Sequence, residues 1–202
     1  MERGALKLNT TNLHKSLLSG KDFCMLKKEK LVDVVFIFSA CMVLVFSLVC
    51  GFVKTKYDRF YINEIEEFSE EFNISPELVL GVVYAESSFN SDAESTAGAV
   101  GLMQILPSTA LWIAQMLNEK DFDTEQLKKP NINIRFGCFY LNYLFQKFED
   151  EEIVLFCYNI GEGVYLEETK TKSFNEIKNE YPRVNKYIKK VKHAKKMYEI
   201  LY

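Results

Sequence analysis

The sequence predicts a mainly α-helical domain that follows an N-terminal membrane-spanning helix. Apolar residues recur at helical spacing throughout the second part of the chain, no stretch alternates as a long strand does, and one long apolar run carries no charge. The 202 residues suffice for one domain and an appendage, and 48% of them are hydrophobic. We therefore expect four parts: a disordered cytoplasmic segment at 1–30, a transmembrane helix at 31–53, a short stalk at 54–57 and a folded domain at 58–202.

The uncharged run covers residues 34–53 and is long enough to cross a bilayer, because about 20 residues span the hydrocarbon core. Seven Lys or Arg residues precede the run, whereas only Lys54, Lys56 and Arg59 follow it closely. The positive-inside rule then predicts a single-pass anchor with a cytoplasmic N-terminus and an extracytoplasmic domain. A cleaved signal peptide would need a shorter apolar core and a small-residue cleavage site. The residues before Cys50 also match a lipoprotein signal poorly, so we favour an uncleaved anchor.

Charge and cysteine content exclude several classes of protein. The formal net charge of −3 gives no reason to expect a nucleic-acid partner. The five cysteines form no CxxC pair and the two histidines lie far apart, so we expect no metal site, no cofactor and no disulfide framework. The sequence leaves open whether Cys138 and Cys157 pair. Residues 183–196 hold seven basic side chains and no acid, which indicates a solvated helix face or a surface that meets an anionic lipid or wall polymer.

Local signals place the helices of the domain. Helical spacing predicts a helix over 57–72, and Ser75 and Pro76 read as the N-cap and first position of the next one. A loop follows at 91–100, and Pro107 opens another helix. A polar linker is expected at 121–129 and a glycine turn at 161–163, with further helical segments at 134–148, 153–158 and 182–201.

Glu86 stands out because it ends an apolar helical stripe. It follows Leu78, Val79, Val82 and Val83 at i, i+3, i+4 spacing, so its carboxyl lies on the apolar face. Loss of hydration disfavours a charged carboxylate and raises its pKa. A raised carboxyl pKa is what a general acid needs near neutral pH. For an isolated Glu, a structural ion pair or cap would be the ordinary interpretation, but the neighbouring motifs favour catalysis.

The neighbouring motifs are the paired segments Ala85–Asn90 and Gly98–Ala110, followed by Asn131–Gly137, Tyr158–Val164 and Tyr181–Val191. With these segments the chain resembles peptidoglycan lytic transglycosylases of the soluble-lytic-transglycosylase (SLT) type, in a membrane-anchored form. The resemblance covers about residues 58–195, and four ordered motifs make it highly specific.

The resemblance implies a lysozyme-like fold and cleavage of the β-1,4 bond between N-acetylmuramic acid and N-acetylglucosamine in peptidoglycan strands. It gives Glu86 the role of a single general acid/base, which protonates the glycosidic oxygen and then deprotonates the muramoyl C6 hydroxyl. Attack of that hydroxyl on C1 would leave a 1,6-anhydro end. The resemblance also implies substrate contacts by Ser95, Gln104 and Tyr158, with Asn159 beside them as a turn or support residue.

The chain departs from the family pattern at two places. The family commonly has Glu-Thr where this chain has Arg183-Val184, so a groove carboxylate is missing or inverted in charge, and Cys157 and Ile160 replace alanines around Tyr158-Asn159.

Two rival functions are also open. A hydrolytic muramidase would need a second catalytic carboxylate, for which Asp92 and Glu94 are the nearest candidates. An inactive peptidoglycan-binding module is the second rival, although the retention of Glu86 argues against it.

Overall fold

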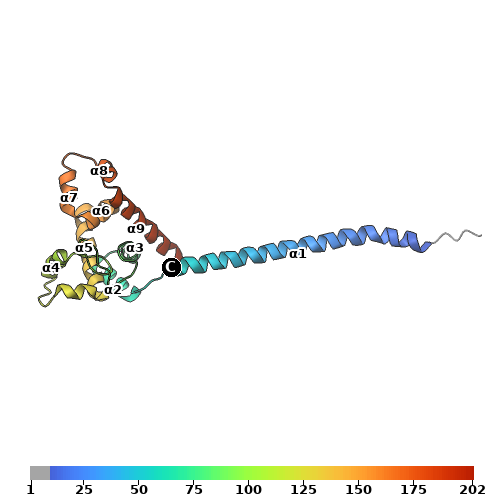
Figure 1. The fold of residues 1–202 in the computed structure, drawn as a ribbon, viewed down its shortest axis with the longest axis horizontal. Helices are drawn as coiled ribbons and strands as arrows, with labels where there is room; N and C mark the ends of the chain where they lie inside the picture. The colour runs from blue at the N-terminus through green and yellow to red at the C-terminus, as the bar shows by residue number, and fades with distance from the viewer. Residues whose placement is uncertain (1–9) are drawn as a thin grey trace, which may run out of the picture. The chain divides into compact units, whose positions relative to one another are not determined.

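The computed structural model describes residues 10–202, with side-chain surroundings from residue 31 onward. The chain forms two compact units, of which the first ends at Lys56 and the second begins at Tyr57. The described part of the first unit is a single helix, α1 (Thr10–Lys56; Figure 1). We expected no regular structure over residues 1–30. Residues 10–30 are instead helical, while residues 1–9 lie outside the described residues. The physical reason is that a helix formed by the apolar run extends into neighbouring Leu- and Lys-rich sequence without a new nucleation step.

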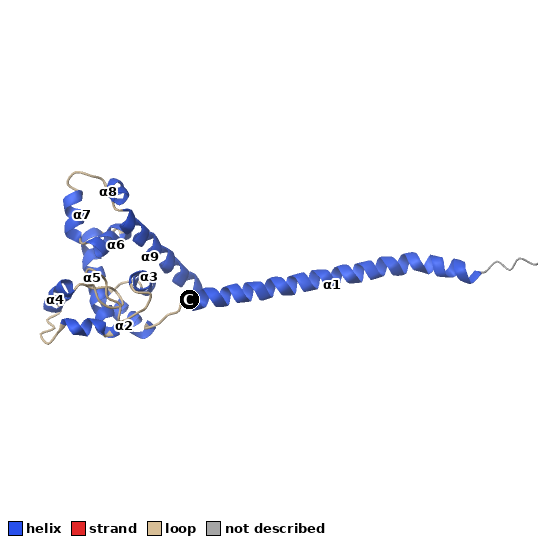
Figure 2. Ribbon diagram, viewed as in Figure 1, coloured by secondary structure: helices blue, strands red, loops and turns tan. Residues whose placement is uncertain are grey.

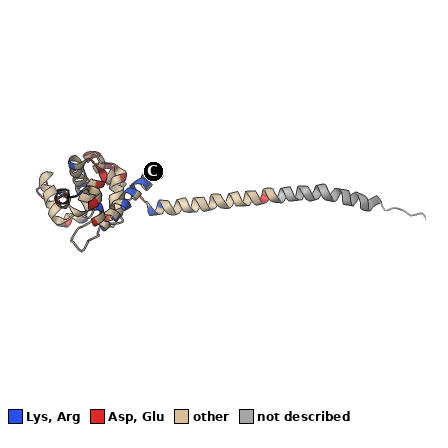
Figure 3. Ribbon diagram, turned by 90° about the horizontal axis from the view of Figure 1, so that it is seen from above, with Lys and Arg blue, Asp and Glu red and all other residues tan. Residues whose placement is uncertain are grey.

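The segment Leu31–Lys56 of α1 is long and apolar enough to cross a membrane. Its apolar side chains are exposed, and Figure 3 shows a long stretch of this helix without Lys, Arg, Asp or Glu. Contact of so much apolar surface with water is unfavourable. An apolar surrounding such as a bilayer therefore remains our prediction for this segment.

The second unit is built from helices joined by loops, and no β-strand forms in the described residues 57–202 (Figure 2). The predicted mainly α fold is thereby confirmed. The elements in chain order are α2 (Ile62–Phe72), α3 (Pro76–Glu86), α4 (Pro107–Met116), the 3₁₀ helix η1 (Thr124–Lys128), α5 (Pro130–Phe148), α6 (Glu151–Ile160), α7 (Glu162–Glu168), α8 (Phe174–Glu180) and α9 (Pro182–Leu201).

Some of these boundaries differ from the sequence predictions because local caps decide them. α2 begins later than expected, after Tyr61, which has left-handed backbone angles (φ 59°). The predicted polar linker contains η1, whose first turn is capped by Asp123. The polar stretch before α9 contains α7 and α8, and α8 begins with a reciprocal capping box between Ser173 and Glu176. Such caps stabilise short helices that carry no long apolar stripe.

Helix α3 packs most extensively against α9. Residues 78–83 of α3 are buried on every side. Gly81 permits the close approach of the two helices, because a Cβ at this position would lie 2.9 Å from the carbonyl oxygen of Val191. As predicted, the Ser75 side chain accepts a hydrogen bond from Leu78 N and Pro76 opens the helix. The α3–α9 contact brings the first half of α9 beside the end of α3.

The basic run of α9 is partly used in packing. Lys192 Nζ lies 2.6 Å from a carboxylate oxygen of Glu152, and Lys195 Nζ lies 2.6 Å from one of Glu151. Both acids stand in the first turn of α6, where negative charge is also favoured by the helix dipole. The run therefore joins α9 to α6, in addition to presenting charge to solvent.

The question of a disulfide between Cys138 and Cys157 is resolved by their state in the structure. Both are buried free thiols. Burial raises the pKa of Cys157 to about 12 and that of Cys138 further above its ordinary value. Both side chains therefore act as small, unreactive core residues.

Candidate active site

One pocket of about 340 Å³ contains every residue that the sequence analysis assigned to the site. It lies where the end of α3, the following loops, α4, α5 and the end of α6 meet. Its lining comprises Glu86, Ser95, Ala97, Ala99, Gln104, Ile105, Leu106, Thr109, Tyr140, Tyr158, Asn159, Ile160 and Gly161. Glu86 is the only residue of this described lining that carries a carboxyl.

Glu86 is the last residue of α3, and its environment favours the protonated form. Burial raises the pKa of its carboxyl from 4.5 to about 7, and three neighbours oppose this effect without cancelling it. Tyr187, Lys190 and Asn159 each favour the charged form. The carboxyl can therefore exist in either protonation state near neutral pH, which suits a group that first gives and then accepts a proton.

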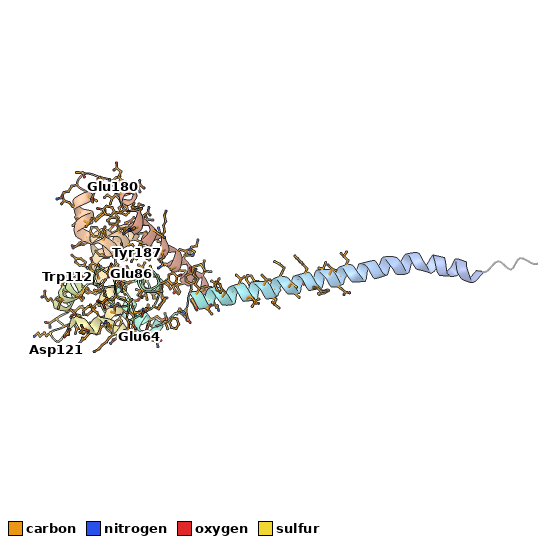
Figure 4. The ribbon with its side chains drawn as sticks, viewed as in Figure 1. Glu64, Glu86, Trp112, Asp121, Glu180 and Tyr187 are labelled. Carbon is orange, nitrogen blue, oxygen red and sulfur yellow. The ribbon has the colours of Figure 1, made fainter. Side chains whose placement is uncertain are left out.

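Tyr187 and Asn159 approach Glu86 from two different helices. Figure 4 shows Tyr187 of α9 beside Glu86. The Tyr187 hydroxyl is buried and, among the described residues, has no partner at full hydrogen-bond geometry. A buried hydroxyl gains from completing such a bond, and the ionised Glu86 carboxylate is the acceptor next to it. The Asn159 side chain, at the end of α6, also interacts with the carboxyl and favours its charge.

The 101–105 loop, which contributes Gln104 and Ile105 to the pocket lining, is held by a buried amide, Asn133 of α5. Its Oδ1 accepts a hydrogen bond from Met103 N (2.7 Å), and its Nδ2 donates to the carbonyls of Val100 (2.9 Å) and Leu127 (2.8 Å). Asn133 is completely buried, so these three bonds satisfy groups that water does not reach. The position of the loop is therefore fixed by α5.

Gly101 begins the turn of that loop and needs to be glycine for two reasons. Its φ of +82° lies in the region that side chains disfavour, and a Cβ would lie 2.6 Å from the carbonyl oxygen of Leu127. The same Cβ would also collide with the Asn133 amide. The absence of a side chain thus permits the contact between loop and α5.

Gln104 and Ser95 both lie on the wall of the pocket, with part of each side chain used inside the loop. The Gln104 amide nitrogen donates to the carbonyls of Ala93 (3.1 Å) and Gly101 (2.9 Å). The amide oxygen of Gln104 is therefore the part of this side chain that can accept a hydrogen bond from a ligand. The Ser95 hydroxyl oxygen accepts a hydrogen bond from Ala99 N (2.9 Å) and retains its own proton for donation.

Tyr158 lines the pocket and also contacts the neighbouring loop. Its hydroxyl donates a hydrogen bond to the carbonyl of Met103 (2.8 Å). Its half-buried ring is close enough to Glu86 for the carboxylate charge to contribute to a strongly raised tyrosine pKa, although loss of hydration is the main cause. Tyr158 therefore supports the 101–105 loop from the α6 side, as Asn133 does from α5.

Four residues at or near the site were assigned no role from the sequence: Ser87, Asn133, Tyr187 and Lys190. Ser87 Oγ donates to Leu102 O (2.8 Å) and joins the end of α3 to the loop. All four lie within segments that carry the family resemblance, but the sequence assigned none of them an individual role. The roles of Tyr187 and Lys190 depend on the α3–α9 contact, whereas those of Ser87 and Asn133 depend on contacts with the loop that follows residue 99.

Three further residues singled out earlier lie outside the pocket lining. Asp92 and Glu94 are exposed loop residues, and Arg183 is exposed in the first turn of α9. Within the described residues, no group of three or more His, Cys, Asp or Glu side chains is placed to hold a metal ion.

The helical fold and a pocket around one partly buried carboxyl define a lysozyme-like domain. The family profile described as "Transglycosylase SLT domain" matches residues 63–181. The chain therefore belongs to the SLT-domain family.

Individual relatives agree with this assignment. The chain is 31% identical over 113 residues to the soluble lytic murein transglycosylase of Salmonella typhimurium, covering 55% of this chain and 18% of the relative. It is 30% identical over 133 residues to the membrane-bound lytic murein transglycosylase C of Haemophilus ducreyi, covering 59% and 36%. A lytic transglycosylase Slt structure from Pseudomonas aeruginosa has the same fold, with a TM-score of 0.64, 23% identity and coverage of 71% of this chain and 24% of that one. The chain thus matches well under half the length of these proteins.

Proposed function

We propose that this protein is a membrane-anchored peptidoglycan lytic transglycosylase. It cleaves the β-1,4 bond between N-acetylmuramic acid and N-acetylglucosamine and leaves a 1,6-anhydro end. The observation that carries the proposal is Glu86, a single carboxyl in the pocket lining whose pKa burial raises to about 7. Membership of the SLT-domain family and the names of the relatives support the same reaction class.

The single carboxyl favours a transglycosylase over a hydrolase. Glycoside hydrolysis normally uses two carboxyl groups on either side of the bond. Asp92 and Glu94, the candidates for a second one, are exposed and do not line the pocket. When the substrate's own C6 hydroxyl is the nucleophile, one residue suffices: Glu86 protonates the leaving oxygen and then takes the hydroxyl proton.

The remaining side chains have supporting roles in this proposal. The Gln104 amide oxygen and the Ser95 hydroxyl face the pocket and bind hydroxyl or N-acetyl groups of the sugar. Asn159 and Tyr187 stabilise the Glu86 carboxylate after it has given up its proton. Tyr158 holds the loop through Met103.

The apolar segment Leu31–Lys56 anchors the enzyme to the cell membrane in this proposal. Because basic residues precede the segment in excess, the N-terminus lies in the cytoplasm and the SLT domain faces the cell wall. A short connection to the membrane restricts cleavage to strands near the membrane surface.

Product masses test the reaction directly. Purified peptidoglycan digested with the full-length protein should release muropeptides one water lighter than the hydrolytic products, and Glu86→Gln should release none. Reducing ends would instead identify a muramidase. Binding to the wall without release of any product, by a folded wild-type protein, would favour the non-catalytic binding module.

A further inference from the structure

Lys190 of α9 contacts the two residues that precede Glu86. Its Nζ donates a hydrogen bond to the carbonyl of Ala85 at 2.7 Å. The same ammonium lies 5.3 Å from the ring centroid of Tyr84, within the range of a cation–π interaction. One side chain of α9 is thus attached to the last turn of the helix that ends at Glu86.

The chemistry of a helix end explains why a lysine suits this position. The last four carbonyls of an α-helix lack intrahelical donors and carry partial negative charge. Ala85 is the penultimate residue of α3, so its carbonyl is one of these groups. An ammonium that bonds to it satisfies the carbonyl and compensates the helix dipole. The contact therefore fixes the turn from which the Glu86 side chain extends.

We infer that Lys190 is a positioning residue for Glu86, which holds the end of α3 through Ala85 and keeps a positive charge beside the carboxyl. The inference rests on the proposed role of Glu86 as acid/base. It adds to that role a residue that is not part of the pocket lining and does not belong to the predicted site.

The groups around Glu86 make the charge of Lys190 distinctive. Tyr187 and Lys190 act on the carboxyl from α9, and Asn159 and Tyr158 act from α6. Among these four described neighbours, only Lys190 carries a formal positive charge. It favours the carboxylate that forms when Glu86 protonates the glycosidic oxygen. It therefore counteracts the effect of burial on the Glu86 pKa and keeps the proton transferable.

Three variants of the full-length protein in detergent micelles test this inference. Lys190→Met removes the charge and the donor, Lys190→Arg retains both, and Lys189→Met removes the same charge from the neighbouring position, which lines a separate hollow with α6 and α8. The pH dependence of kcat/KM is measured with purified peptidoglycan, and the pH dependence of the free energy of unfolding is measured in parallel.

Lys190→Met should shift the alkaline limb of the kcat/KM profile to higher pH by about 0.2–0.7 unit, the range that exposed ion pairs produce. The free energy of unfolding of Lys190→Met should also fall more steeply than that of wild type between about pH 5 and pH 8, because a higher Glu86 pKa in the folded state makes ionisation of the folded protein less favourable. Lys190→Arg should restore both properties and Lys189→Met should leave both unchanged. High salt should reduce the difference from wild type, because Lys190 is exposed.

Two results would overturn the inference. A uniform loss of stability in Lys190→Met, with unchanged pH profiles, would make the residue merely structural. An equal change in Lys189→Met would assign the effect to the general basic charge of α9. The unfolding measurement needs no turnover, so a protein that releases no product but responds to Lys190→Met would refute the proposed function and leave the Lys190–Glu86 coupling supported.

Discussion

Replacing Glu86 by Gln should stabilise the protein at alkaline pH while it abolishes catalysis. Burial raises the pKa of this carboxyl from 4.5 to about 7, so ionisation is less favourable in the folded than in the unfolded chain. The unfolded chain therefore loses this proton at lower pH, and stability falls as pH rises between these two values. The difference corresponds to about 3 kcal/mol above the folded-state pKa. Gln has nearly the same shape and no charge to bury.

The single tryptophan provides the assay. Trp112 lies on α4 and packs against the aromatic rings of α5, so its fluorescence reports on the second unit and not on α1. Urea unfolding of full-length protein in detergent should give similar free energies for wild type and Glu86→Gln at about pH 4. At about pH 8 the variant should be more stable by about 3 kcal/mol.

A control separates this effect from the general pH response. Glu66→Gln removes an exposed carboxylate of α2, outside the pocket, and should follow wild type at both pH values. A constant difference between Glu86→Gln and wild type at all pH values would refute the reasoning, because it would mean that Glu86 ionises equally readily in both states.

Two further predictions concern the 101–105 loop. Asn133→Ala should lower the free energy of unfolding by about 3 kcal/mol, because Met103 N and the Leu127 carbonyl lose their partner and the Val100 carbonyl keeps only its bond from Ile105 N. Urea titration measures the loss, and a cost below about 1 kcal/mol would contradict the buried network. Tyr158→Phe should lower the free energy of unfolding by about 1 kcal/mol, because its hydrogen bond to Met103 is lost. It should also lower kcat, with little change in the pKa of Glu86. A kcat equal to wild type in purified-peptidoglycan digestion would show that this bond does not hold the loop for catalysis.

Local sequence accounts for much of the fold. The 3.6-residue spacing of apolar side chains identifies α3, α5 and α9, and prolines mark the starts of α3, α4, α5 and α9. The short helices α7 and α8 have no comparable stripe. They depend on caps such as Ser173–Glu176 and on ion pairs such as Lys172–Glu168, which are weak signals in sequence.

The sequence by itself determined the position of Glu86 at the end of an apolar stripe and the motifs that accompany it, because helical periodicity and turn residues act over only a few positions. It could not determine which side chains surround that carboxyl. Tyr187 and Lys190 lie about one hundred residues further along the chain, and only the packing of α9 on α3 at Gly81 brings them there. The tertiary structure decided the Glu86 environment, because burial and charge depend on distances in space that residue spacing does not encode.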